Sequence, residues 1–234
     1  MKIVKHIPNA ITCLNLCSGC IACTLAFEGQ LLWAALFVCL GAVFDFFDGF
    51  AARLLHAYSP IGKELDSLAD MVSFGVAPGM ILFYMLSSIM PLLSAPAWVL
   101  YLPYLAFIIP AFSALRLAKF NVDERQTTSF IGLNTPANAL FWISIIYSTQ
   151  QLAAQNVILY IVVVLLLVGL TSYLLIAEIP MFSLKINSVR WKGNESRYIL
   201  IASSILFIAL WGFLGVSGAI LLYILLSIIS RKKS

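Results

Sequence analysis

Long apolar runs limit what this chain can fold into. The run from Ile158 to Leu170 contains no charged side chain, so no face of it is suited to water. A helix needs about 20 such residues to cross the hydrocarbon core of a bilayer. With a mean hydropathy of +1.00 and only 10% charged residues, the sequence excludes an ordinary soluble domain and predicts an integral membrane protein.

The pattern within the runs indicates helices rather than strands. Transmembrane barrels use segments of about ten residues in which apolar and polar side chains alternate. The runs here are apolar on every side, which predicts an all-α fold, a polytopic transmembrane helical bundle. The connections between runs are short, so we expect a single membrane domain over residues 1–234.

The runs predict about eight spans, and the last two of them are short for a helix that crosses perpendicular to the membrane. The expected spans lie near residues 8–27, 31–53, 64–90, 97–118, 135–152, 157–177, 198–213 and 217–230.

The fourteen basic residues test this arrangement. None lies in the outer turns expected near residues 29, 93, 154 and 215. All of them lie in or next to the segments that are cytoplasmic if the N-terminus is, namely 1–7, 54–63, 119–134, 178–197 and 231–234. The positive-inside rule therefore predicts that the N- and C-termini are both cytoplasmic.

Cysteine and histidine add little chemistry. The five cysteines lie in the first two runs, and no histidine accompanies them at metal-ligand spacing. An odd number in this setting argues against a disulfide framework, so we expect small, buried packing residues. They are Cys13, Cys17, Cys20, Cys23 and Cys39. His6 and His56 are expected to face solvent or lipid headgroups.

Four aspartates stand out against this apolar background, in two pairs. On a helix, Asp45 and Asp48 share one face with Gly49 and Ala52, and Arg53 marks the cytoplasmic end of that helix. These small neighbours would leave room for a bulky phosphorylated ligand, and the arginine could contact a phosphate.

The second pair, Asp66 and Asp70, is one helical turn apart on the next helix. We expect Ser59-Pro60 and Gly62 to break the chain and the new helix to begin around Lys63. An antiparallel hairpin of the two helices would then bring the four carboxylates together.

Four acidic side chains in a low-dielectric setting repel one another and lose hydration, so they need protons or cations. Ligands that are all oxygen favour Mg²⁺ or Mn²⁺, with Ca²⁺ as an alternative, and paired ions of this kind usually position phosphates. A structural role in interface salt bridges is the competing interpretation, although acids inside a membrane are functional by default. A cation-coupled transporter would also use such a site.

The spacing of these residues resembles the signature of the CDP-alcohol phosphatidyltransferases, a polytopic family that uses two divalent ions to transfer a phosphatidyl group from a CDP-linked lipid to an alcohol, releasing CMP. The matching pattern is Asp45-x2-Asp48-Gly49-x2-Ala52-Arg53-x8-Gly62-x3-Asp66-x3-Asp70.

The resemblance implies a role for each residue. Asp45 and Asp66 would bridge both ions, Asp48 would complete the first ion site and Asp70 the second. Asp70 would also be the catalytic base that takes the proton of the acceptor alcohol. The residues implied to bind the CDP-lipid are Asn9, Thr12, Gly49, Ala52, Arg53, Ser59 and Gly62.

The signature does not choose the acceptor, but the flanking stretches at 7–19, 64–79, 115–122 and 130–139 resemble membrane-integral bacterial phosphatidylserine synthases. This resemblance implies CDP-diacylglycerol and L-serine as substrates in phospholipid biosynthesis, and a homodimer. Asn134 departs from it, because a proline is expected there. Membrane lipids are the other expected partners, and nothing suggests nucleic acid.

For serine, Arg116 and Lys119 lie one turn apart where they could receive the carboxylate. Asn121 and the loop 123–129 could contact the amine. The two basic residues could equally just anchor the helix end. Other acceptors, such as glycerol 3-phosphate or an inositol phosphate, remain open. We expect a multi-pass protein of the cell inner (cytoplasmic) membrane with its active site facing the cytoplasm.

Overall fold

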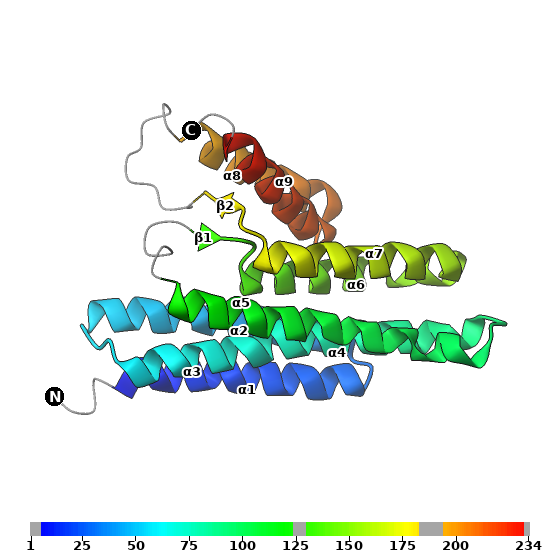
Figure 1. The fold of residues 1–234 in the computed structure, drawn as a ribbon, viewed down its shortest axis with the longest axis horizontal. Coiled ribbons are helices and arrows are strands. Elements are labelled where there is room, and N and C mark those ends of the chain that lie inside the picture. The colour runs from blue at the N-terminus through cyan, green and yellow to red at the C-terminus, as the bar shows by residue number, and fades with distance from the viewer. Residues whose placement is uncertain (1–5, 124–129, 183–193, 232–234) are drawn as a thin grey trace.

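A computed structural model describes residues 6–123, 130–182 and 194–231 (Figure 1). Helices dominate these residues, as expected, and the strands found in them are β1 (Phe130–Ile131) and β2 (Pro180–Met181). The helices are α1 (Ile7–Phe27), α2 (Leu31–Leu54), α3 (Pro60–Asp70), α4 (Ala77–Ile89), α5 (Ile108–Val122), α6 (Thr135–Gln155), α7 (Val157–Ile176), α8 (Glu195–Trp211) and α9 (Leu214–Arg231).

Two of the expected spans are not regular α-helices. A π-helical segment, Met71–Val76, joins α3 to α4 within one continuous helical stretch, and a 3₁₀ segment, Ala97–Phe107, runs directly into α5. Pro103 lies inside the 3₁₀ segment, where its missing N–H prevents regular α-helical bonding. Short π-helical insertions often occur at functional sites, and this one directly follows Asp70.

Five helical stretches in the described part of the chain are long and apolar enough to cross a membrane. They are Ile7–Phe27, Leu31–Leu54, Pro60–Leu92, Ala97–Val122 and Val157–Ile176. They agree with the first four expected spans and the sixth, and they make this a membrane protein. The helix α6 falls outside the set because Asn138, which is fully buried, and the exposed Gln150 and Gln151 lower its mean hydropathy.

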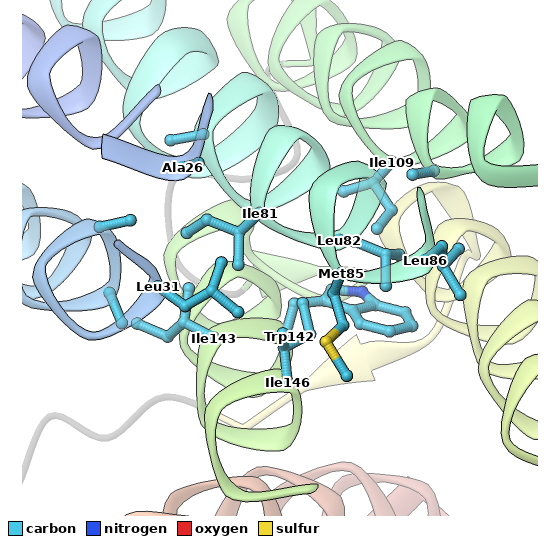
Figure 2. Packing of buried hydrophobic residues seen from close by; sticks show 14 of the residues in the cluster. Ala26, Leu31, Ile81, Leu82, Met85, Leu86, Ile109, Trp142, Ile143 and Ile146 are labelled. Carbon is cyan, nitrogen blue, oxygen red and sulfur yellow. The ribbon is translucent and has the colours of Figure 1, made fainter. Parts of the chain in front are cut away.

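The helices form a layered bundle. In Figure 1, α1 to α5 lie side by side, α6 and α7 cover them, and the α8–α9 hairpin crosses this second layer at an angle. The core lies between the layers, where Leu82 and Met85 of α4 meet Trp142 of α6 (Figure 2). The indole of Trp142 is fully buried and donates a hydrogen bond to Oγ1 of Thr171 on α7, at 3.1 Å.

A short strand pair lies beside the start of α6 and the end of α7 (Figure 1). Phe130 pairs with Met181 and Ile131 with Pro180 in antiparallel register. The pair ties the connection before α6 to the chain that leaves α7. Asn134 then caps α6, since its Oδ1 accepts a hydrogen bond from the backbone N–H of Ala137 at 3.0 Å. An asparagine suits this N-cap position, which accounts for its presence where a proline was expected.

The expected start of the third helix is wrong. The helix α3 begins at Pro60, not around Lys63. Ser59 is its N-cap, with Oγ accepting a hydrogen bond from the backbone N–H of Gly62 at 3.0 Å. Proline is favoured in the first helical turn, where its missing N–H needs no partner. Ser59 and Pro60 therefore start the helix instead of delaying it.

The expected burial of the cysteines is also wrong. Cys13, Cys17 and Cys20 are exposed on the outer face of α1, and Cys23 and Cys39 are half-buried; all five are free thiols. The packed face of α1 instead carries other small residues, among them Asn15, Ser18, Gly19, Ala22 and Ala26. The two histidines, His6 and His56, are exposed as expected.

Candidate active site

Carboxylates from α2 and α3 meet where both helices pack against α1. Asp45, Asp48 and Asp66 each offer an oxygen that lies within 4.8 Å of the others. The first two stand one turn apart on α2 and the third projects from the first turns of α3, so the helical hairpin assembles the cluster. Asp48 is buried, while Asp45 and Asp66 are half-buried.

The fourth carboxylate, Asp70, lies deeper and is bonded to α1. Its Oδ1 accepts a hydrogen bond from Nδ2 of Asn15 at 3.2 Å, and both residues are buried. Asp45 lies next to both Asp66 and Asp70, and thereby joins the three-residue cluster to the deeper carboxylate.

The π-helical segment keeps this region tightly packed. Ser73, in that segment, donates a hydrogen bond from Oγ to the backbone carbonyl of Asn15 at 2.8 Å. Gly19, one turn further along α1, lies so close that a Cβ there would be 2.4 Å from Oγ of Ser73. The backbone of α1 therefore approaches the chain just after Asp70 at a distance that only glycine permits.

The cluster fits a divalent cation. Oδ2 of Asp48 and Oδ1 of Asp66 are buried, and neither has a hydrogen-bond partner among the described residues. A buried carboxylate oxygen without a partner is costly, and a hard cation satisfies it. The donors are all oxygens, as Mg²⁺, Mn²⁺ and Ca²⁺ prefer. Asp45, Asp48 and Asp66 are the residues that would hold such an ion.

A pocket of about 210 Å³ opens beside the cluster. It contains six of the seven residues expected to bind a CDP-lipid, and Lys63 and Tyr58 also line it. The six are Asn9, Thr12, Gly49, Ala52, Ser59 and Gly62. The seventh, Arg53, does not line the pocket: it is exposed, and its Nε donates a hydrogen bond to the backbone carbonyl of Gly49 at 3.0 Å.

The two glycines of this pocket differ in their surroundings. A Cβ on Gly49 would meet no atom within 4 Å, so the backbone of α2 is open to a ligand there. A Cβ on Gly62 would lie 3.0 Å from both Oδ1 of Asn9 and Oγ of Ser59. Glycine at position 62 thus lets α3 begin close to α1.

Arg116, on α5, borders the carboxylates from the other side. It is buried, and its Nη1 donates a hydrogen bond to Oγ1 of Thr135 at 3.4 Å. Its guanidinium lies over the ring of Phe120, 5.0 Å from the centroid, and close enough to Asp45 and Asp70 for electrostatic attraction. Its Nε has no hydrogen-bond partner in the described parts of the chain.

Arg116 also lines a second pocket, of about 350 Å³, at the ends of α5 and α7. Its lining residues are Arg116, Lys119, Val122, Asp123, Ile131, Leu175, Ile176 and Glu178. The two basic residues expected to receive an acceptor carboxylate thus share one cavity.

Asn121, the third residue expected to contact the acceptor, does not line that pocket. Its Nδ2 donates a hydrogen bond to Oγ of Ser67, and its backbone carbonyl accepts one from Nζ of Lys63, both at 3.0 Å. These bonds join the end of α5 to α3. Of the loop 123–129, only Asp123 belongs to the described residues.

Several polar residues at the site or buried in the helices could not be assigned a role from the sequence. Asn15 and Asn138 are fully buried amides within apolar runs, and Asn138 has a partner for neither amide atom among the described residues. Because a buried amide in an apolar setting is costly, each could have been singled out by type and position. Thr135 and Glu178 carry no such local signal, because their neighbours come from distant parts of the chain.

These observations define a polytopic membrane protein with a carboxylate cluster suited to divalent cations and a pocket next to it. The chain belongs to the CDP-alcohol phosphatidyltransferase family, whose model matches residues 5–169.

Curated relatives named CDP-diacylglycerol–serine O-phosphatidyltransferase share about a third of their aligned residues with this chain. The protein of Bacillus subtilis is 36% identical over 133 residues, which are 57% of this chain and 71% of the relative. That of Mycobacterium tuberculosis is 34% identical over 155 residues, 63% of this chain and 51% of the relative. That of Methanocaldococcus jannaschii is 37% identical over 134 residues, 57% of each chain. The chain therefore matches about half the length of the mycobacterial relative.

Proposed function

We propose that this protein transfers a phosphatidyl group from CDP-diacylglycerol to the hydroxyl of L-serine, giving phosphatidylserine and CMP. The observation that carries the proposal is the cluster of Asp45, Asp48 and Asp66, with its unpartnered buried oxygens, directly beside a pocket. The choice of serine is supported by the names of the relatives and by the cationic side chains of Arg116 and Lys119 in the second pocket.

In this proposal, the four aspartates hold two divalent cations, Mg²⁺ or Mn²⁺, with Ca²⁺ as an alternative. When bound, such cations neutralise negative charge on the pyrophosphate of the lipid and on the carboxylates. Asp45 and Asp66 would contribute to both ion sites, Asp48 to the first and Asp70 to the second. Asp45 is central because it lies next to both Asp66 and Asp70.

The CDP-lipid would occupy the first pocket. Gly49 leaves the backbone of α2 open there, and Lys63 supplies a positive charge among the lining residues. Asn9, Thr12, Ala52, Ser59 and Gly62 would form the remaining contacts that the family signature implies, and Arg53 would have to leave its bond to Gly49 in order to join them. The lipid tails can remain in the bilayer.

Asp70 would act as the general base. It takes the proton of the serine hydroxyl while the hydroxyl oxygen attacks the lipid-bearing phosphorus in line; the bond from that phosphorus to CMP breaks, and CMP leaves with the bonding electrons. The hydrogen bond from Asn15 to Oδ1 would hold the carboxylate in position for this step.

The membrane arrangement in this proposal has about eight spans in one domain over residues 1–234, with α6, α8 and α9 added to the five apolar stretches. The distribution of basic residues supports cytoplasmic termini, an inner-membrane location and an active site that opens to the cytoplasm. Family resemblance supports a homodimer, which light scattering of the purified protein in detergent would test.

The proposal is tested with purified protein in detergent, CDP-diacylglycerol, Mg²⁺ or Mn²⁺, and labelled serine. We expect CMP release that depends on serine, and none from an Asp45→Asn variant. CMP release with glycerol 3-phosphate but not with serine would show that only the acceptor is wrong. Ion-dependent uptake into liposomes without CMP release would indicate a transporter instead.

A further inference from the structure

The second pocket adjoins the carboxylates through one side chain. Arg116 lines the pocket and also lies close enough to Asp45 and Asp70 for electrostatic attraction. The pocket is bounded by the end of α5, by β1 and by the end of α7. A small molecule held there would therefore contact Arg116, whose guanidinium lies beside Asp45 and the proposed catalytic base, Asp70.

The charges of this pocket balance. Arg116 and Lys119 supply two positive charges, Asp123 and Glu178 supply two negative charges, and the other lining residues are apolar. Such a pocket suits a ligand that carries both charges and no net charge. An acceptor with its own phosphate would bring negative charge close to Asp123 and Glu178, which disfavours it.

Backbone hydrogen bonds fix the chain on both sides of Glu178. The backbone N–H of Leu133 donates to the carbonyl of Leu174, and that of Gly132 donates to the carbonyl of Ile179, both at 2.9 Å. These bonds bracket Glu178 between the end of α7 and the strand pair. Two residues beyond Leu133, Thr135 accepts the hydrogen bond from Arg116. The connection that precedes α6 therefore contacts both the chain around Glu178 and the side chain of Arg116.

Gly132 makes this close approach feasible. Its φ is +76°, and a Cβ there would lie 2.8 Å from the carbonyl oxygen of Leu175. A side chain at this position would push the connection away from α7 and widen the pocket. The position of the backbone at Glu178 relative to α5 therefore depends on glycine at position 132.

We propose that this pocket is the acceptor site and that Glu178 determines specificity by pairing with the ammonium group of a small amino-acid zwitterion, whose carboxylate faces Arg116 and Lys119. The inference rests on the proposed function and adds to it a residue that the family signature does not contain. It assigns the distinction between an amino acid and a simple hydroxy acid to a single side chain.

The test compares L-serine with 3-hydroxypropionate, which has the same hydroxyl and carboxylate but no ammonium group. Glu178→Gln keeps the size of the side chain and removes its charge. Because the variant loses a charged partner that only serine, with its ammonium group, can use, we expect the ratio of kcat/KM for serine to that for 3-hydroxypropionate to fall about tenfold or more, which corresponds to about 1.4 kcal/mol or more. The KM for CDP-diacylglycerol should stay within about twofold, a factor that corresponds to less than about 0.5 kcal/mol.

Glu28→Gln is the matched control, since Glu28 lies in the turn between α1 and α2 and hydrogen-bonds Gln30 instead of lining the pocket. An active Glu178→Gln variant with an unchanged ratio would overturn the inference and leave the proposed function intact. If the unmodified protein released no CMP with any alcohol, the proposed function itself would be wrong. If Glu178→Gln does not fold, Glu178→Asp, which keeps the charge, should retain the preference for serine; loss of that preference would overturn the inference.

Discussion

Asn15 on α1 donates a hydrogen bond from Nδ2 to Oδ1 of Asp70, at 3.2 Å, and both side chains are buried. The donor comes from the first helix and the acceptor from the end of α3, so this bond joins two parts of the chain at the proposed catalytic base. It holds Oδ1 of the carboxylate that, in the proposed function, takes the proton of the acceptor.

Replacing Asn15 with leucine should lower kcat about tenfold or more, because a lost hydrogen bond to a charged group costs about 1.5–3 kcal/mol. The KM for CDP-diacylglycerol should change little, since Asn15 does not line the lipid pocket. Steady-state kinetics check both values. Ser18→Ala on the same buried face is the control, because Oγ of Ser18 bonds only the carbonyl of Leu14 in its own helix. Equal losses in the two variants would point to a general packing effect.

Asp70→Asn should bind CDP-diacylglycerol and lose turnover. The amide keeps the size of the side chain and can still contact Asn15, but it cannot take the proton of the acceptor. Lipid-dependent thermal stabilisation in detergent measures binding, and CMP release measures turnover. A near-normal kcat in this variant would remove Asp70 from the role of base.

Divalent metal should bind to the protein without any substrate. Mn²⁺ titration followed by electron paramagnetic resonance should show binding that weakens at least tenfold in Asp48→Asn and in Asp66→Asn, each of which removes one negative charge from the cluster. Chelation should abolish CMP release, and added Mg²⁺ or Mn²⁺ should restore it. Unaltered Mn²⁺ affinity in both variants would contradict the assignment of the cluster as a metal site.

Two glycine substitutions should affect different properties of the protein, one the binding of the lipid and the other the stability of the fold. Gly49→Val adds a side chain where a Cβ meets no atom within 4 Å, so folding should be preserved while the KM for CDP-diacylglycerol rises several-fold. Gly19→Ala should instead lower the thermal stability, since the new Cβ would lie 2.4 Å from Oγ of Ser73. Thermal unfolding and lipid kinetics on both variants distinguish an open pocket from a tight helix contact.

Arg116→Ala should raise the KM for serine more than that for CDP-diacylglycerol. The guanidinium lines the second pocket and not the first, which is the reason for this split. Arg53→Ala is the informative comparison, because Arg53 lies in the last turn of α2 and is proposed to contact only the lipid. Equal changes in both KM values for Arg116→Ala would favour a purely structural role for this arginine.

Much of the fold could be predicted because apolar length and helical spacing are local properties. The runs predicted the five stretches that are long and apolar enough to cross a membrane, and the spacing of Asp45, Asp48 and Asp66 predicted that they would meet. The exposure of Cys13 on the outer face of α1 could not be predicted in the same way. In a membrane protein the outer surface is apolar as well, so an apolar side chain does not indicate which face is packed.

Other features depend on contacts between distant residues or on backbone detail. Serine and proline occur both in breaks and at helix starts, and the bond from the backbone N–H of Gly62 to Ser59 shows that here they start a helix. The π-helical segment after Asp70 packs against α1, which is distant in the sequence, through the hydrogen bond from Ser73 to the carbonyl of Asn15. Glu178 faces the same pocket as Arg116 only because the strand pair brings the end of α7 to the end of α5.

The most direct test of the account is to follow labelled serine and CMP together in one reaction with CDP-diacylglycerol and a divalent cation. We expect label to enter the lipid fraction as phosphatidylserine in equal amounts with released CMP, and Asp70→Asn to abolish both. Absence of CMP release from the folded, metal-loaded protein, with serine and with every other alcohol tried, would contradict it.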